Sequence, residues 1–360
     1  RRAFEEVCPT AQTIGMAGFF GLPVAYTPMA TEANRPQLPG LLAPTMQVSD
    51  TVTQLHKARG QHKDLTDKVA ALRKHRLDNK KQLNAASKWP SAAFSFVEVA
   101  GFGYLAKLAD WVKPVAKQRK NTDRTGLPKR YQAITRPSIV NISISQKVEL
   151  AEKVLISIGL KNGFSSTVLL VSHGSQSANN AHAAGLDCGA CCGQSGEVNA
   201  RVLAGILNDV SVRQGLQNKG IYIPLNTTFI AALHNTTTDE IETFDLDLMT
   251  DEALKHWETI VPMLQEAGDK VRRERAANLH IKSVNQPEQL LDTYRRRAND
   301  GAQTRPEWGL AGNAAFVIAP RSRTKGAFFD GRSFLHEYDP TKDSNGEVLE
   351  QLMTAPMLVT

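Results

Sequence analysis

The stretch 166–208 most constrains what this 360-residue chain can fold into. It begins with an apolar, β-branched run, Thr167–Val171, which is typical of a buried parallel strand. It ends in an amphipathic helix, whose apolar face carries Val198, Val202, Leu203, Ile206 and Leu207. Similar strand and helix patterns alternate along the chain. The sequence therefore predicts an α/β protein with a mostly parallel sheet flanked by helices, and a site at the carboxyl end of this strand.

A histidine and a cysteine in the loop between this strand and helix have the chemistry of zinc ligands. His173 follows the strand, and Cys188 comes fifteen residues later, a spacing that suits a loop folding back on itself. Zinc needs at least three protein ligands, so this pair alone is a weak signal. Asp187, beside Cys188, and His234, at the end of a later strand, are possible outer residues that position the ligands.

The cysteines of this loop permit two other interpretations. Cys188 and Cys191 form a C-x-x-C pair, which can be redox-active when the first cysteine begins a helix. Here Cys192 and two glycines separate the pair from the predicted helix, which argues against redox chemistry. The cysteines can also be small buried residues of a tight loop. All three interpretations stay open on the residues alone.

Other polar candidates are weaker. We expect His182 to lie on a surface loop, and His256 and His280 to face solvent. Arg321 and Arg323 could line an anion site, but a solvated loop is the preferred interpretation.

The net charge of +7 is unevenly distributed along the chain. Residues 57–88 hold ten Lys or Arg against three Asp. Such a patch can bind nucleic acid or an anionic membrane, but a solvated helical face is the simpler interpretation. We expect no nucleic-acid partner, because no aromatic residues are interleaved for base stacking. No apolar run reaches eighteen residues, so no transmembrane helix is predicted.

The pattern divides the chain into three parts. We predict the start of a core over 1–44, a helical and basic insertion over 45–136, and an α/β core with the His/Cys site over 137–360. The insertion should hold an exposed helical hairpin over Val52–Leu83 and a buried helix over Phe94–Val112. Ser145 is the expected N-cap of the next helix. In 13–26, glycines at 15, 18 and 21 indicate a close backbone approach to another segment.

Several long blocks resemble the DabA family, the soluble subunit of a bacterial inorganic-carbon uptake complex. They are GMAGFFGLP (15–23), SFVEVAGFGY (95–104), SHGSQSANNAHAAGLDCGACCGQSGEVNARVLAGILND (172–209), IPLNTTFIAALHNTTTDE (223–240), RPEWGLAGNAAFVIAPR (305–321) and DGRSFLHEYDP (330–340). The blocks lie in the family's order and span nearly the whole chain.

This resemblance implies a β-carbonic-anhydrase-like core with helical insertions and a zinc ion held by Cys, Asp, His and Cys. His173 matches the histidine ligand and Cys188 the second cysteine ligand, whereas Cys191 and Cys192 match no ligand. The first cysteine and the aspartate belong to a C-I-D-x-R-type motif that would precede Arg1. We therefore expect this chain to be part of a longer protein and to be inactive alone.

The implied function is zinc-dependent, energy-coupled hydration of carbon dioxide to bicarbonate. The implied partner is DabB, an integral membrane cation-translocating subunit, which would place this chain as a peripheral protein on the cytoplasmic face of the inner membrane. The alternatives are a structural-zinc scaffold that binds a membrane partner and, less favoured, a C-x-x-C thiol oxidoreductase.

Overall fold

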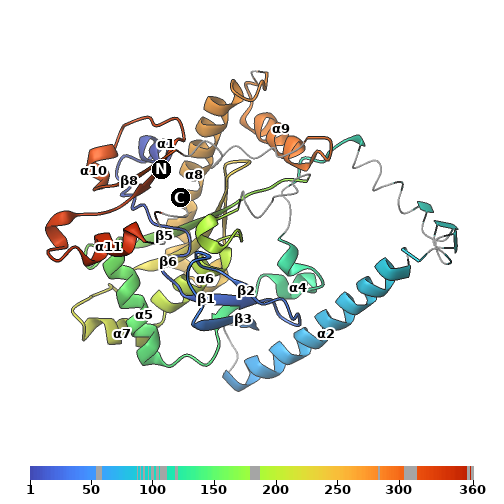
Figure 1. The fold of residues 1–360 in the computed structure, drawn as a ribbon, viewed down its shortest axis with the longest axis horizontal. Helices are drawn as coiled ribbons and strands as arrows, with labels where there is room; N and C mark the ends of the chain where they lie inside the picture. Colours follow the sequence, from blue (N-terminus) through green and yellow to red (C-terminus); the bar gives the residue numbers. More distant parts are fainter. Residues whose placement is uncertain are drawn as a thin grey trace.

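The part of the chain that the structure describes is a mixed α/β fold with three small sheets (Figure 1). This computed structural model describes residues 1–53, 59–86, 112–117, 121–178, 187–282, 284–303 and 314–354, with short pieces between 88 and 105 and residue 357. The first sheet has the order β2 (Arg35–Pro36), β1 (Val24–Thr27), β3 (Met46–Val52), β4 (Thr135–Ile139). The second has the order β5 (Thr167–Gly174), β6 (Thr228–Asn235), β7 (Glu240–Thr243). The third pairs β8 (Ala315–Ile318) with β9 (Ser333–His336).

The expected α/β class is confirmed, but the mostly parallel sheet is wrong. In the described residues β1 with β3, β5 with β6, and β8 with β9 are parallel, whereas β2, β4 and β7 are antiparallel edge strands. The error has a physical reason, because an apolar strand pattern shows burial and does not show the direction of its neighbour. The three-part division of the chain stays a prediction, although β3 pairs with β1 and β4 across both proposed boundaries.

Helices cover the sheets and join their strands. The described helices are α1 (Arg2–Val7), α2 (Arg59–Ala86), α4 (Lys129–Gln132), α5 (Ile144–Ser157), α6 (Glu197–Leu207), α7 (Val210–Gln217), α8 (Asp251–Ala276), α9 (Pro287–Asn299), α10 (Arg321–Thr324) and α11 (Glu347–Met353). The N-cap of α5 is Ser143 rather than the expected Ser145, because Ser143 and Gln146 form a reciprocal capping box. None of the described helices is long and apolar enough to cross a membrane.

The helix that follows the cysteine loop, α6, is the centre of the core. Every residue of α6 except Gly205 is buried, and the helix packs against β5 and β6 on one side and β4 on the other. Its apolar residues join those of α5, α7 and both larger sheets in the main hydrophobic cluster. The helix therefore joins the first sheet to the second.

Buried charges reinforce this junction. Arg201 of α6 donates to Glu197 one turn earlier at 3.0 Å and to both carboxylate oxygens of Asp245 at 2.7 and 2.9 Å. Arg124 and Asn121 also donate to Glu197, at 2.9 and 2.8 Å. Burial opposes ionisation of Glu197, but the charges of Arg201 and Arg124 lower its pKa. Each charged group in this network is therefore compensated.

The predicted helical insertion differs from the expectation in two ways. Where a hairpin was predicted, the structure has one long helix, α2, which runs from β3 away from the rest of the molecule (Figure 1). The described side chains Phe94, Phe102 and Val112 are 85–86% exposed, so the predicted burial of Phe94–Val112 is wrong for them. Apolar character predicts burial only where another element covers the side chain, and no described element packs over these three.

An ion pair joins α10, late in the chain, to α1 at its start. Arg321 of α10 donates to Glu5 of α1 at 2.8 Å through Nε, and both side chains are at most 10% exposed. The expected solvated loop at Arg321 is therefore wrong, because sequence distance hid its partner. Arg323 is exposed, as expected. Burial raises the pKa of Glu5, but hydrogen bonds from Arg321 and Thr13 outweigh it and lower the pKa to about 2.

Removing the central arginine of the α6 network should destabilise the protein strongly. Arg201→Met leaves the buried Glu197 and the half-buried Asp245 without their main cation, which we expect to lower the free energy of unfolding by about 3–5 kcal/mol. Arg296→Met is the control, because Arg296 is 59% exposed and its pair with Asp292 spans 4.0 Å; it should cost less than about 1 kcal/mol. Urea unfolding measures both, and equal losses would contradict the role of the network.

The Glu5 pair should make stability depend on acid pH. The folded-state pKa of Glu5 lies near 2 against 4.5 for the free group, so the pair stabilises fully above pH 4.5 and its contribution is lost as pH falls toward 2. We expect Glu5→Gln to lower the free energy of unfolding by about 2–3 kcal/mol at pH 7 and to flatten its fall between these pH values. Urea midpoints against pH measure this, with the exposed Glu149→Gln as control. An unchanged acid profile would refute the assignment.

Candidate metal-binding site

The carboxyl ends of two parallel strands bring the two predicted histidines side by side. His173 of β5 and His234 of β6 are paired in register. Directly paired residues of neighbouring strands project from the same face of a sheet. Both imidazoles therefore lie on one face, at the edge where the sequence predicted a site.

A tight turn after β5 holds the cysteines. Cys188 precedes the single 3₁₀ turn η3 (Gly189–Cys191), and its carbonyl accepts the amides of Cys191 at 2.9 Å and Gly193 at 3.0 Å. Cys192, with φ of 58°, and Gly193, with φ of 70°, take the left-handed conformation that reverses the chain toward α6. The side chains of Cys188 and Cys191 are fully buried.

The turn at residues 17–22 closes over this pair. A Cβ atom added at Gly18 would lie 2.6 Å from Cys188 Sγ and 3.8 Å from His173 Nδ1. No other residue type would leave this space, so the backbone of Gly18 packs directly on the sulfur atom. The expected close approach of the glycine-rich segment is confirmed at Gly18, and it occurs at the histidine and cysteine that the sequence singled out.

The surroundings of Cys188 favour a thiolate. Its pKa is well below the ordinary value, because Cys191 and then His173 hydrogen-bond to its sulfur atom, which outweighs the effect of burial. The pKa of Cys191 is raised in turn, because it donates to the sulfur atom of Cys188 and is itself buried. The shared hydrogen bond therefore shifts the pKa values of the two cysteines in opposite directions. Their complete burial argues against thiol exchange, which needs access to a second reactant.

Asp187 holds the start of the cysteine turn against the end of β5. Its Oδ1 accepts the amide of Ser175 at 2.7 Å and the hydroxyl of Ser175 at 3.1 Å. Burial raises its pKa, although these bonds and the nearby His173 oppose the rise. A Cβ atom at Gly174 would lie 3.5 Å from Oδ1, so the carboxylate sits directly over the end of β5. This is a positioning contact between strand and turn.

His234 is held by a second group of charges. Its Nε2 lies 3.0 Å from Oδ1 of the buried Asp239, and Arg275 of α8 pairs with the same carboxylate. Burial opposes ionisation of Asp239, but His234 and Arg275 lower its pKa. The imidazole is thereby fixed beside His173, with about a third of its side chain exposed.

Sequence reasoning missed one residue that shapes the site. Asn199 of α6 is fully buried, and its Nδ2 donates to the carbonyls of Phe19 and Gln37, both at 2.9 Å. These bonds hold the turn that carries Gly18 against the helix. The sequence did contain a signal for Asn199, which is a single amide side chain on the buried face of an apolar helix. A buried amide needs hydrogen-bond partners, so such a residue indicates a contact with another segment.

The remaining candidates take no part in the arrangement. His256 and His280 are exposed, as expected, and His182 lies outside the described residues. The sulfur atom of Cys8 contacts the hydroxyl of Thr10 at 3.6 Å. Within the described parts of the chain, no three His, Cys, Asp or Glu residues come together as a complete metal-binding group. The structure therefore brings together His173 and Cys188, with Asp187 and His234 beside them.

The family model and the similar proteins that comparison finds all carry the same family description. The model of the family described as probable inorganic carbon transporter subunit DabA matches residues 1–360. Proteins with that description from Methylovorus glucosotrophus, Ralstonia pickettii strain 12J and Vibrio cholerae strain M66-2 are 57%, 58% and 43% identical over the whole chain. The chain spans about 42% of the length of each of these relatives. No solved structure matches it.

The contact at Gly18 predicts a steric effect. Gly18→Ala puts a methyl group 2.6 Å from Cys188 Sγ, so the turn or the sulfur must move, and we expect a loss of about 1–3 kcal/mol in the free energy of unfolding. The matched control is Gly205→Ala in α6, where an added Cβ meets nothing within 4 Å, and which should stabilise the helix by about 0.5–1 kcal/mol. Thermal or urea unfolding measures the stability of both variants. A Gly18→Ala variant as stable as the parent would rule out the close packing of Gly18 on the sulfur atom.

Proposed function

Because this chain belongs to the DabA family of inorganic carbon transporter subunits, we propose that His173 and Cys188 are two ligands of a zinc ion that serves the hydration of carbon dioxide to bicarbonate. The observation that carries the proposal is their convergence beside Gly18. A Cβ atom added there would lie 2.6 Å from Cys188 Sγ and 3.8 Å from His173 Nδ1, so both side chains reach the same point of the backbone.

The chemistry of the two donors fits zinc. Zinc binds thiolate sulfur and imidazole nitrogen, and the thiolate form of Cys188 is favoured by its neighbours. The strand ladder fixes His173 on one side, and the amide of Gly196 donates to its carbonyl at 3.0 Å on the other. A ligand pair that is already aligned needs little reorganisation to bind an ion.

Two donors do not complete a zinc site, which takes at least three from protein. The described residues contain no such set of three, and the chain spans about 42% of its relatives' length. We therefore propose that residues in the part of the family that this chain does not span supply the other ligands. Bound in this way, zinc supplies the Lewis acidity for hydration.

The residues around the pair have separate tasks in this proposal. Gly18 and the residues of the 17–22 turn exclude water from Cys188, which strengthens its electrostatic interactions. Asp187 holds the cysteine turn on β5 through Ser175, as outer residues commonly orient metal ligands. His234 stands beside His173 with its ring fixed by Asp239.

The family also suggests a partner and a location. We propose that the protein works with an integral membrane, cation-translocating subunit, DabB, and lies peripherally on the cytoplasmic face of the inner membrane. Coupling to ion movement would make hydration directional and would account for a transporter subunit.

A second candidate is a structural zinc ion in a scaffold that binds the membrane partner. The complete burial of Cys188, with Gly18 packed on its sulfur atom, favours it, because structural zinc sites are closed. The two candidates share the ligands and differ in whether carbon uptake needs them.

Zinc content of variants of the natural full-length protein tests the assignment. We expect His173→Ala and Cys188→Ser each to reduce zinc from stoichiometric to near zero by elemental analysis, because each removes a donor from the first coordination sphere. Carbon uptake by cells should be lost with the metal. The control is Cys8→Ser, whose sulfur atom contacts Thr10 and belongs to no metal-binding group among the described residues, and which should leave both unchanged.

The outcomes separate the candidates. Stoichiometric zinc in both site variants would exclude these residues as ligands. Loss of zinc and of thermal stability with carbon uptake retained would favour the structural role. Loss of zinc and uptake in a folded protein supports the proposed hydration.

A further inference from the structure

The C-terminal half of α2 is an exposed, positively charged arm. Arg73 is the last buried residue of the helix, and it donates to the carbonyls of Met29 at 2.8 Å and Thr125 at 3.0 Å. Beyond the contact of Leu77 with the loop at Gly126, the helix extends away from the body of the protein (Figure 1). Its cations are therefore not used to bind other parts of the described structure.

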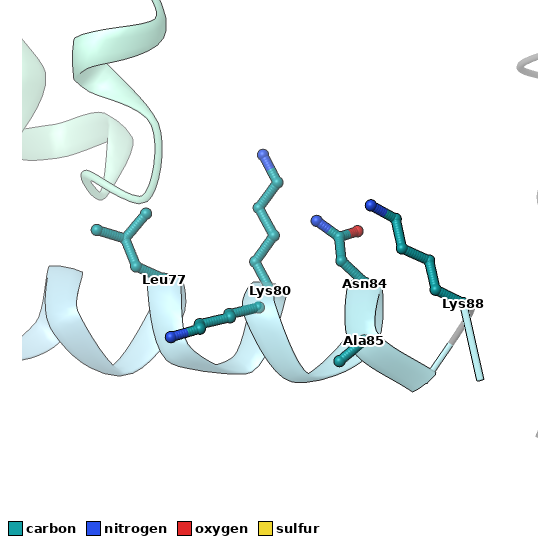
Figure 2. Close-up of a pocket in the computed structure, with 6 residues that line it drawn as sticks. Leu77, Lys80, Asn84, Ala85 and Lys88 are labelled. Atoms are coloured by element: carbon teal, nitrogen blue, oxygen red, sulfur yellow. The ribbon is translucent and has the colours of Figure 1, made fainter.

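Lysines gather along this arm. Lys80, Lys81 and Lys88 line an open groove of about 460 Å³ together with Leu77, Asn84 and Ala85. Lys80, Asn84 and Lys88 project from the same side of the helix (Figure 2). Together with Lys74 and Arg76 these lysines make five cationic residues. Asp78 is the single acidic residue among the described residues from 74 to 89.

Large apolar side chains accompany these charges. Leu83 is 61% exposed and Trp89 is 68% exposed, within and directly after the lysine cluster. Further along, Phe94 and Phe102 are each 86% exposed. Scattered exposed apolar residues are ordinary, but a leucine and a tryptophan among lysines are not needed for a merely solvated face.

We propose that this arm, residues 74–89, binds the surface of an anionic phospholipid bilayer. Lysines are attracted to anionic headgroups, and Trp and Leu side chains enter the boundary between headgroups and acyl chains. The long lysine stems can cover apolar surface while their ammonium groups stay at the headgroups. Binding to nucleic acid would use the cations but would leave the apolar residues exposed. The inference deepens the peripheral membrane location proposed above by naming the surface that contacts lipid, and no part of it depends on His173 or Cys188.

Vesicle co-sedimentation of the natural full-length protein tests the proposal. We expect binding to vesicles of phosphatidylcholine with 30% phosphatidylglycerol, weaker binding to pure phosphatidylcholine, and release by 0.5 M salt, which screens charges beyond a few ångströms. Each lysine near an anionic surface should contribute about fivefold to the partition coefficient. Replacing Lys74, Lys80, Lys81 and Lys88 with Gln should therefore lower it about a hundredfold or more.

Two matched variants make the result specific. Replacing the same four lysines with Arg should keep binding, because the charge is retained. Replacing the exposed Lys161, Lys255, Lys282 and Lys325 with Gln removes the same charge elsewhere and should change binding less than about fivefold. Trp89→Ser should weaken binding even at low salt.

Three results would overturn the proposal. They are no binding to anionic vesicles, equal losses from the two sets of Gln substitutions, and retention of full binding by the arm variant. Failure to bind vesicles together with arm-dependent capture of an acidic protein partner would assign the surface to protein binding instead. Zinc content is measured in parallel and should be the same in all variants, so a failure here is separate from a failure of the zinc assignment.

Discussion

The position of α6 between two sheets is the constraint on which the rest of the structure depends. A helix buried on all sides can start with a carboxylate only if cations meet it, and Arg201 and Arg124 do so at Glu197. Arg201 then joins the helix to Asp245 beyond β7. The ionic network thus fixes the rotation of α6, and with it the face that the helix presents to the cysteine turn.

The candidate site is assembled from segments that α6 holds together. The amide of Gly196 bonds to the carbonyl of His173, and Asn199 holds the turn that carries Gly18. A strand end, a turn from near the start of the chain and the cysteine loop therefore meet at one place. A dry and closely packed centre of this kind strengthens electrostatic interactions, so the imidazole of His173 acts strongly on the pKa of Cys188.

The use of charge differs completely between the centre and the arm. Around α6, arginines pair with carboxylates and donate to backbone carbonyls, so their charges stabilise the interior of the protein. On the outer half of α2, lysines face solvent with apolar neighbours and few carboxylates. The excess of positive charge in the sequence thus resides mainly where it can act on another surface. A single chain therefore combines a neutralised interior with an arm suited to an anionic partner.

The sequence by itself determined the strand β5, the helix α6 and the close approach of the glycine segment, and it singled out the candidate pair His173 and Cys188. The apolar run before His173, the periodicity of α6 and the glycines of 13–26 were sufficient, because strand, helix and close approach leave local patterns. Strand direction, the partner of Arg321, the bonds of Asn199 and the exposure of Phe94 were decided only by the tertiary structure. Each depends on what a distant segment places next to a residue, and no local pattern contains that information. For the same reason, the sequence names His173 and Cys188 as candidates, whereas their convergence beside Gly18 is a property of the fold.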